Sequence, residues 1–438
     1  MNGRSRQLYF AATLFLLPGA VWSQSAAPEY WEGSRSNAGK SQALVMRVEH
    51  SGSSSKASVD LPEFGALSIP AAAFSMGESK VHFELIGDAS NAVFEGKLAA
   101  GAIRGTWNEG AQGGEFQLRR GQDTRAGVRE EAVSFPSGEV RLAGTLLLPA
   151  EHNPAAAIVF VQGAGPETRN ASRFLAEFFV KLGVAALIYD KRGAGASTGD
   201  WKHSSFDDLA GDAVEAVNYL KSRREVDPLR IGLMGTSQGG WIAPMAAVRS
   251  ADVHFVIAKS AAGVDPEEQE LARLEMQMRS DGNRPEDIKE AVELYRQMIA
   301  YARTGHGWEE LSAALKTASQ KSWYDFGAIV KDWWFFEFIR VNFAHDPIPV
   351  LQRMKSPLLI ILGGKDIDTP VEASLRRLIP ALNGAGCRSV IQVFPGAGHD
   401  LRVEAGKGEP WDFPHFAPGY LELLASWVKL QTGKAPSA

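Results

Sequence analysis

Six continuous apolar runs constrain the fold of this chain more than any other feature of its sequence. They begin near residue 155, recur until about residue 395 and are separated by helical segments. They read "AAIVFVQG", "VAALIYD", "IGLMG", "HFVIAKS", "PLLIILGG" and "SVIQVFPG". A strand that is apolar on both faces needs cover on both sides, which a parallel sheet between two layers of helices provides. The sequence therefore predicts an α/β fold.

The segments around these runs fit the same architecture. The stretch "EAVSFPSGEVRLAGTLLLP", residues 131–149, predicts an antiparallel hairpin before the first run. Helical patterns cover residues 172–182 and 206–222. Ser205, followed three residues later by Asp208, has the spacing of a capping box at the start of the second helix.

A long insertion separates the fourth run from the fifth. It covers about residues 262–351 and contains the helical pattern "PEDIKEAVELYRQMIAYA" and the aromatic stretch "KDWWFFEFIRVNF". We expect a helical cap over the carboxyl ends of the strands, where open α/β sheets bind ligands. Its aromatic residues either line an acyl pocket or, as the simpler interpretation, pack the cap onto the sheet. They are Trp333, Trp334, Phe335, Phe336 and Phe338.

The first part of the chain follows a different pattern. Residues 28–122 are rich in glycine, serine and alanine, and apolar residues alternate with polar ones in runs such as "ALVMRVEH" and "KVHFELIG". Such alternation between glycine-rich turns predicts a small antiparallel β domain, either a barrel or a sandwich. The charged stretch 120–131 lacks apolar periodicity and predicts a linker. The chain of 438 residues has room for this domain and for a second one over residues 130–434.

The N-terminus carries the pattern of a secretory signal peptide. Arg4 and Arg6 precede an apolar run that ends near Leu17, and small residues up to Ser23 offer a cleavage site. We expect residues 1–23 to be removed on export and the mature protein to be secreted or periplasmic, without stable membrane insertion. The alternative is an uncleaved membrane anchor, which needs an apolar run of about 20 residues, longer than this one.

Composition and charge argue against several partners. The net charge is -5 and the pI near 6.0, and no cluster of lysine and arginine marks a predicted element, so we expect no nucleic-acid partner. Histidine, cysteine and carboxylate residues do not recur at metal-ligand spacing, and we predict neither a metal nor a cofactor.

The stretch "DKRGAGAS", which contains Asp190 and Arg192, lacks the lysine and the spacing of a phosphate loop. We interpret it as structural support for active-site loops. The single cysteine, Cys387, allows no disulfide within the chain.

One stretch has the form of a strand-to-helix turn around a nucleophile. "IGLMGTSQGGW" ends an apolar run and places Ser237 between Gly235 and Gly239. Side chains at the two glycine positions would collide with the neighbouring strand and helix, and the serine needs a positive φ to project its hydroxyl. The backbone N–H of Gln238 would point at a developing oxyanion. The alternative interpretation is a glycine-rich turn without chemistry.

A serine nucleophile needs a base, and the base needs a carboxylate that orients it. Of the nine histidines, only His399, in "VFPGAGHDL", follows a predicted late strand through a glycine-rich loop. Asp366 and Asp368, in "LLIILGGKDIDTP", lie just beyond the preceding predicted strand. These residues are the candidates for base and orienting acid.

From about residue 130 to the C-terminus, the chain resembles the α/β-hydrolase superfamily, and in particular secreted bacterial hydrolases of esterase type with a helical cap. The motifs that carry the resemblance are "VQGAGP", "YDKRGAGASTGD", "GTSQGG", "LGGKDIDTP" and "GAGHD", with serine, aspartate and histidine in the order of that family. Through "YWEG", "FEGKL" and "GTW", the β domain is similar to the N-terminal accessory domain of such hydrolases. The resemblance implies an α/β-hydrolase fold with a helical cap insertion.

Carried over residue by residue, the resemblance implies a catalytic triad. Ser237 is the nucleophile, His399 the general base and acid, and Asp366 the orienting acid, with Asp368 as the rival for that role.

The resemblance also implies an oxyanion hole built from backbone N–H groups. The first donor is Gln238, and the second is Ala164 or Gly165 in the loop after the first apolar run. Many relatives have His-Gly where this chain has Gln162-Gly163, which puts in question how that loop packs and hydrogen-bonds.

Three functions remain open from the sequence. The first is a serine carboxylesterase whose partners are small-molecule esters of small or medium acyl groups. The second is a serine peptidase or amidase of the same fold, and the third is a non-catalytic secreted binding protein. An intact set of serine, aspartate and histidine argues against the third, and the aromatic cap favours the first. The sequence leaves the acyl group and the oligomeric state undetermined.

Overall fold

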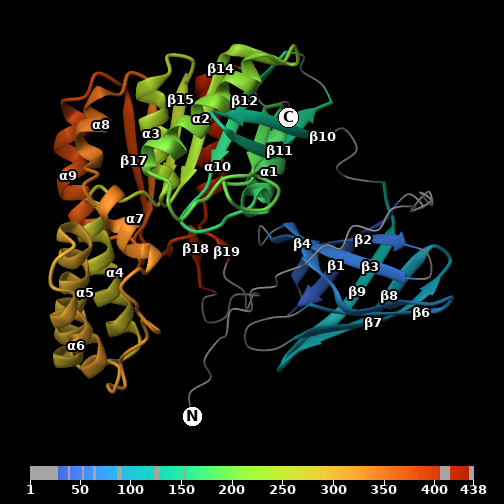
Figure 1. Ribbon diagram of the computed structural model, residues 1–438. Coiled ribbons are helices and arrows are strands. Elements are labelled where there is room, and N and C mark those ends of the chain that lie inside the picture. Colours follow the sequence, from blue (N-terminus) through green and yellow to red (C-terminus); the bar gives the residue numbers. More distant parts are fainter. Residues whose placement is uncertain are drawn as a thin grey trace, which may run out of the picture. The chain divides into compact units, whose positions relative to one another are not determined.

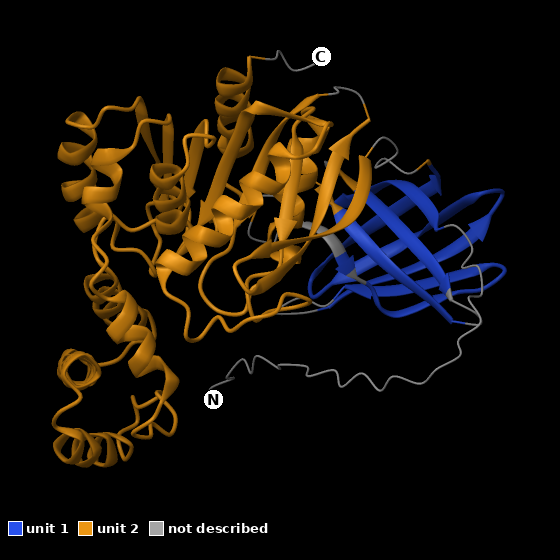
Figure 2. Cartoon of the chain, turned by 45° about the horizontal axis from the view of Figure 1, so that its top comes forward, with its two compact units in different colours: residues 1–37, 44–60, 68–121 blue, residues 38–43, 61–67, 122–438 orange. Residues whose placement is uncertain are grey.

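The structure is a computed structural model that describes residues 28–37, 40–51, 54–62, 66–85, 91–122, 128–150, 154–404 and 415–433. The chain divides into two compact units at the boundary between Gly121 and Gln122, and the short segments 38–43 and 61–67 are grouped with the second unit (Figure 2). The expected signal peptide, residues 1–23, lies outside the described residues. Among the described helices, none has both the length and the apolar character to cross a bilayer.

The first unit is an antiparallel sheet that has nine strands within the described residues, in the spatial order β4-β3-β2-β1-β9-β8-β7-β6-β5 (Figure 1). The strands are β1 (Glu29–Asn37), β2 (Lys40–Ser51), β3 (Ser54–Leu61), β4 (Ala66–Pro70), β5 (Ala72–Met76), β6 (Lys80–Leu85), β7 (Ala92–Ala99), β8 (Ala102–Glu109) and β9 (Gln112–Arg120). Neighbours from β5 to β9 pair antiparallel, as do β1 with β9 and β2 with β3. The predicted antiparallel domain is confirmed.

The core of this unit lies on one face of the sheet. Leu44, Met46 and Val48 of β2 are fully buried and alternate with residues that are partly exposed, which is the period of a strand covered on one side. Phe83 and Phe94 on neighbouring strands stack with ring centroids 4.4 Å apart. The strands form one curved sheet (Figure 1).

The second unit is built on a mostly parallel sheet of eight strands, in the order β10-β11-β13-β12-β14-β15-β16-β17 within the described residues. They are β10 (Val128–Ser137), β11 (Val140–Pro149), β12 (Ala155–Val161), β13 (Ala185–Tyr189), β14 (Val226–Thr236), β15 (Phe255–Lys259), β16 (Leu358–Gly363) and β17 (Ser389–Phe394). β11 pairs antiparallel with β10 and β13, and the other pairs are parallel. Each predicted apolar run is a strand of this sheet, and the predicted fold class is confirmed.

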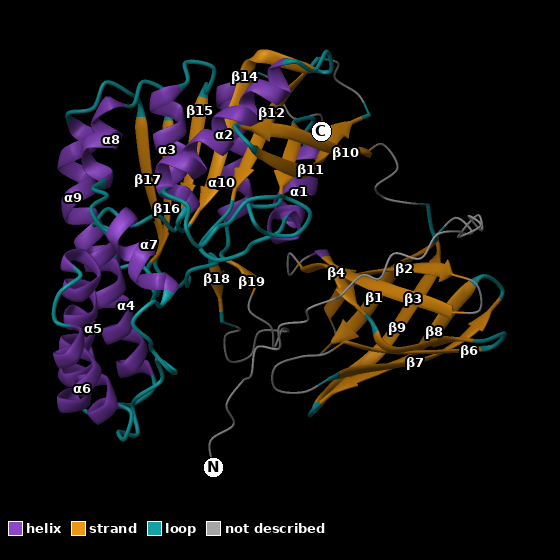
Figure 3. Ribbon diagram, viewed as in Figure 1, coloured by secondary structure: helices purple, strands orange, loops and turns teal. Residues whose placement is uncertain are grey.

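Helices cover both faces of the parallel sheet (Figure 3). The short 3₁₀ turn η2 (Arg169–Ser172) and α1 (Arg173–Lys181) lie on one face with α10 (Tyr420–Thr432). The other face carries α2 (Phe206–Lys221), α3 (Gly239–Arg249), α8 (Pro347–Arg353) and α9 (Val371–Asn383). The predicted capping box starts α2, because Ser205 Oγ accepts from the N–H of Asp208 and the Asp208 carboxylate accepts from the N–H of Ser205.

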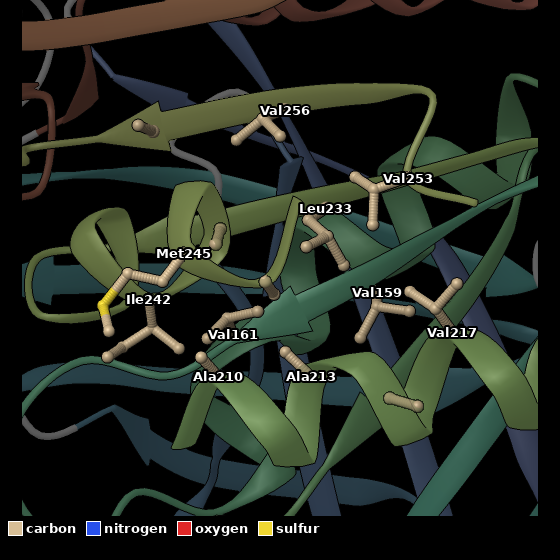
Figure 4. Packing of buried hydrophobic residues seen from close by; sticks show 14 of the residues in the cluster. Val159, Val161, Ala210, Ala213, Val217, Leu233, Ile242, Met245, Val253 and Val256 are labelled. Carbon is tan, nitrogen blue, oxygen red and sulfur yellow. The ribbon is translucent and has the colours of Figure 1, made fainter. Parts of the chain in front are cut away.

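Small and branched side chains bring α2 and α3 close to the strands. Figure 4 shows Val159 and Val161 of β12 next to Ala210 and Ala213 of α2, with Ile242 of α3 near Val161. The valines and alanines are fully or almost fully buried, and alanine allows a helix to approach the sheet closely.

The insertion between β15 and β16 forms helices with a core of their own. They are α4 (Pro266–Ser280), α5 (Pro285–Thr304), α6 (Trp308–Ala318) and α7 (Trp334–Asn342). Met298, Phe336 and Ile339 lie at the centre of this apolar cluster. The last helix of the insertion, α8, instead packs with α3 and α9 on the sheet. A short pair, β18 (Arg402–Val403) with β19 (His415–Phe416), follows the main sheet.

The connections place a crevice at the carboxyl edge of the sheet. From β12 the chain crosses to β13 on one side, and it later returns to β14 on the other side of β12. At such a switch point the loops after the two central strands diverge, and ligands bind between them. The loops after β12 and β14 are those that carry the candidate oxyanion donors and the candidate nucleophile.

Candidate active site

Ser237 lies in a tight turn between β14 and α3. Its φ is 54°, as a strained nucleophile turn requires. A Cβ at Gly235 would lie 1.9 Å from the carbonyl oxygen of Gly239, and a Cβ at Gly239 would lie 2.3 Å from that of Val161. Side chains at these two positions would therefore collide as predicted. Glycine lets the turn pack against the end of β12.

Asp366 and His399 come from the loops after β16 and β17. Asp366 Oδ2 and His399 Nδ1 are 2.8 Å apart and hydrogen-bonded. The other carboxylate oxygen accepts from the N–H groups of Asp368 and Thr369 at 2.8 and 2.9 Å. The Asp366 carboxylate is thus held in one orientation, and it faces Nδ1 of the histidine, which leaves Nε2 as the atom that can accept a proton.

The surroundings of His399 alter its affinity for a proton. Burial lowers its pKa, but the hydrogen bond and charge of Asp366 and the charge of Asp368 outweigh burial, and the net effect raises the pKa above its ordinary value of 6.5. The Lys259 ammonium opposes this increase. His399 is held from the backbone as well, since Ser260 Oγ donates to its carbonyl oxygen at 2.5 Å.

Asp368, the rival acid, lies close to this pair. Ligand atoms of Asp366, Asp368 and His399 lie within 4.8 Å of one another, near enough to hold a cation. However, Asp366 Oδ2 and His399 Nδ1 already share a proton in their hydrogen bond, which a metal ion would have to displace. The backbone N–H of Asp368 is the group that contacts Asp366.

Ser237 and His399 line a cavity of about 600 Å³. Its wall includes all three candidate oxyanion residues, Gln238, Ala164 and Gly165. Among the described residues, the N–H groups of Gln238, Ala164 and Gly165 donate to no protein atom. The structure therefore brings Ser237, His399 and the candidate oxyanion residues to one cavity, and Asp366 joins this site through its hydrogen bond to His399.

The aromatic stretch lines the cavity in part and packs within the insertion in part, and Phe338 also packs against the core of the sheet. Trp334, Phe335 and Phe338 line the cavity. Phe336 is 5% exposed and belongs to the core of the insertion, where Trp333 packs against it with ring centroids 5.5 Å apart. Consecutive residues of one helix point to different sides, so the run serves both roles.

Polar residues of α4 also line the cavity, and sequence reasoning did not find them. They are Gln269, Glu270 and Arg273. Glu270 Oε2 accepts from Arg273 Nε and Nη2 at 3.1 and 3.0 Å. Residues three or four apart share one face of a helix, and this spacing was the only available signal. The cavity thus has an aromatic wall and a charged wall.

The loop after β12 is fixed by polar contacts. Gln162, which stands where many relatives have histidine, donates from Nε2 to the carbonyl oxygen of Tyr189. The N–H of Gly163 donates to Glu167 Oε2 at 2.8 Å. Gly165 has a φ of 85°, which favours glycine. The glutamine therefore anchors this loop to β13.

The "DKRGAGAS" stretch supports neighbouring loops through ion pairs. Asp190 is buried and accepts from Arg169 Nη2 at 2.7 Å, and Arg192 donates to both carboxylate oxygens of Asp212 at 2.7 Å. Lys191, between them, is buried beside the cavity, and sequence reasoning assigned it no role.

Comparison with known proteins agrees with this architecture. The family model described as "Serine aminopeptidase, S33" matches residues 152–284, which include Ser237. The chain is 25% identical to esterase EstD of Thermotoga maritima over 66% of this chain and 65% of the relative. It is 32% identical to the quorum-quenching protein AidA of Acinetobacter baumannii over 25% of this chain and 36% of that protein. The chain thus spans less than two thirds of either relative.

Among solved structures, the α/β hydrolase GrgF from Penicillium matches 70% of this chain and 100% of its own, with 20% identity and a TM-score of 0.46. The strand order of the sheet and the position of Ser237 after β14 are those of the α/β-hydrolase fold. The second unit thus has the α/β-hydrolase fold, and the chain is similar in sequence to an esterase and to the serine aminopeptidase family model.

Proposed function

We propose that this chain is a serine hydrolase that cleaves carboxylic esters of small or medium acyl groups through an acyl-enzyme. The observation that carries the proposal is the 2.8 Å hydrogen bond between His399 Nδ1 and Asp366 Oδ2, beside the cavity that Ser237 lines. Asp366 is the orienting acid of this triad because its carboxylate contacts the imidazole, while Asp368 contributes a backbone N–H to Asp366.

The proposed reaction has two halves. His399 Nε2 takes the proton of Ser237 as the serine oxygen attacks the ester carbonyl, and the N–H groups of Gln238 and Ala164 stabilise the oxyanion. The histidine then returns the proton to the departing alcohol. Water attacks the acyl-enzyme with His399 as base, which releases the acid and regenerates the serine.

The aromatic lining of the cavity supports an apolar acyl or alcohol group. Trp334, Phe335 and Phe338 supply rings against which a short hydrocarbon chain can pack. The similarity to esterase EstD supports an ester as the substrate.

A serine peptidase or amidase is the second candidate, and two observations favour it. The matching family model is described as a serine aminopeptidase. In addition, Gln269, Glu270 and Arg273 give the cavity the polar groups that a peptidase needs to hold a peptide backbone or a charged terminus. The same triad would serve either substrate.

A substrate panel separates these functions. We expect the purified protein to react with a fluorophosphonate in a titration that counts active serines, and to cleave short-chain p-nitrophenyl esters with a higher kcat/KM than aminoacyl p-nitroanilides. A higher kcat/KM for the anilides would make the protein a peptidase or amidase. Absence of both labelling and turnover, in protein whose circular dichroism reports a folded state, would make it a binding protein.

We also propose export with removal of residues 1–23. Arg4, Arg6 and the short apolar run that follows support this proposal. Mass spectrometry of the mature N-terminus from a native host should find a chain that begins after Ser23. A chain that still begins at Met1 would contradict export by this route.

A further inference from the structure

Lys191 is buried beside the cavity, and its ammonium group joins the two segments that carry the candidate oxyanion donors. It follows β13 in the chain and is 3% exposed. Nζ donates to the carbonyl oxygen of Gly163, in the loop after β12, and to Oε1 of Gln238 at 2.8 Å, in the turn after β14. One side chain therefore bridges the crevice at the switch point of the sheet.

The contact with Gly163 determines where the N–H of Ala164 points. In a planar trans peptide, the carbonyl of one residue and the N–H of the next point in opposite directions. The carbonyl oxygen of Gly163 faces Lys191, so the N–H of Ala164 points away from the ammonium group. Ala164 lines the cavity, and this N–H donates to no other described residue.

The other side of Gly163 is held by a group of opposite charge. Its N–H donates to Glu167 Oε2 at 2.8 Å. The two peptide units that flank Gly163 are thus each fixed by a charged side chain, one negative and one positive, and charge-assisted hydrogen bonds are stronger than neutral ones. This arrangement favours Ala164 over Gly165 as the second donor.

We infer that Lys191 is a positioning residue that holds the N–H of Ala164 in place and ties its loop to the turn that carries Gln238, so that the oxyanion hole exists before substrate binds. The inference rests on the proposed function, because an oxyanion forms only if Ser237 attacks a carbonyl. Donors that are already oriented need no reorganisation in the transition state, and their effect therefore falls on kcat.

The charge of Lys191 has a consequence for pH dependence. Burial lowers its pKa to about 8, against the opposing charges of Glu167 from the loop after β12 and Asp212 from α2. The ammonium form is complete below this pH, and it is lost as the pH rises through it. The neutral amine makes weaker hydrogen bonds, so kcat of the wild type should decline above about pH 8.

Lys191→Met tests the role of the ammonium group directly. It keeps a flexible side chain of similar size and removes both hydrogen bonds. We expect kcat for p-nitrophenyl acetate to fall about 10- to 100-fold, less than the 10²- to 10³-fold loss for removal of a donor itself, with KM changed less than about threefold. Lys181→Met, at an exposed position in the last turn of α1, is the matched control and should leave both constants unchanged.

A boronic acid that forms a tetrahedral adduct with the serine provides a second measurement. Its affinity for Lys191→Met should fall by the same factor as kcat, because the adduct uses the oxyanion hole as the transition state does. Lys191→Gln keeps an uncharged donor that reaches one atom less far. It should have a kcat between those of the wild type and Lys191→Met, and its kcat should not decline near pH 8. It also serves as the test if Lys191→Met does not fold.

The outcomes separate this inference from the proposed function. If the wild type neither reacts with a fluorophosphonate nor cleaves esters, the proposed function fails. If the wild type is active and both Lys191 variants keep its kcat, the positioning role is wrong. If the variants raise KM and leave kcat unchanged, Lys191 binds substrate directly, and the positioning role is again overturned.

Discussion

The carboxyl edge of the sheet and the cap insertion contribute to one cavity by different physical means. At the sheet edge, backbone geometry decides the structure. Ser237, Ser260 and Leu401 have positive φ, and a Cβ at Gly239 would overlap the end of β12. In the cap, side-chain packing determines the structure. Aromatic residues of α7 lie on both sides of the helix, some in the cavity and some in the cap core.

This difference predicts which property of the protein a substitution should alter in each region. A strained backbone position with close neighbours accepts few residue types, so changes at the sheet edge should alter chemistry. An apolar wall accepts several side chains of similar volume, so changes in the cap should alter substrate preference or stability.

The largest effect should follow from Ser237→Ala. Loss of the nucleophile should lower kcat by about 10⁵- to 10⁶-fold and abolish fluorophosphonate labelling, with little change in the free energy of unfolding. Steady-state kinetics and urea denaturation measure the two quantities. Ser250→Ala, at the other end of α3, is the control and should keep its activity. A Ser237→Ala enzyme that is still labelled would place the nucleophile elsewhere.

The next largest effect should follow from Asp366→Asn. An amide cannot hold the imidazole in the required tautomer, and we expect kcat to fall by about 10⁴-fold. Asp368→Asn keeps the backbone N–H that contacts Asp366 and should lower kcat by less than about tenfold. The two variants, compared by kcat with the same ester, decide between the acids. The reverse ranking would make Asp368 the orienting acid.

A smaller effect should follow from lowering the pH of the wild type. The neutral form of His399 is the base, and its pKa lies above the ordinary 6.5 because Asp366 and Asp368 together outweigh burial. Activity should therefore rise with pH through that value, and kcat/KM should fall about tenfold for each unit below it. A pH profile of kcat/KM measures this limb. A midpoint below 6.5 would show that the carboxylates do not govern this histidine in solution.

The smallest effect on catalysis should come from the cap, where adjacent residues of α7 offer a matched pair. Phe335→Ala removes part of the cavity wall and should lower kcat/KM for a hexanoyl ester, relative to an acetyl ester, by about tenfold, which is the lost burial of about two methylenes at about 0.8 kcal/mol each. Phe336→Ala removes a core residue and should lower the free energy of unfolding by about 3–5 kcal/mol without changing chain-length preference.

Ester kinetics over a series of chain lengths and denaturant unfolding compare these two variants. Equal loss of chain-length preference in both would mean that the cap acts as one mobile body and not through separate faces of α7.

The sheet could be predicted because its constraints are local in sequence. A strand buried on both faces must be apolar throughout, as residues 155–161 and 358–363 are, and a capping box needs only Ser205 and Asp208 three residues apart. The collisions at Gly235 and Gly239 follow from the same logic, because a strand that turns sharply into a helix leaves no room for side chains.

The second wall of the cavity could not be predicted in this way. Helical spacing indicates that Gln269, Glu270 and Arg273 share a face of α4, but it does not indicate what that face meets. The same limit explains why Phe335 and Phe336 could not be assigned to cavity or core from a continuous aromatic run.

Local sequence patterns were sufficient to predict the α/β class, the antiparallel first domain and the residue types at the sheet edge, because burial and strained turns select residues locally. Which of these residues contact one another depends on the packing of the whole unit. Asp366 and not Asp368 contacts His399, and Lys191 reaches both Gly163 and Gln238. These contacts join segments that lie far apart in the chain, and their geometry follows from the order of the strands in the sheet, which no local pattern records.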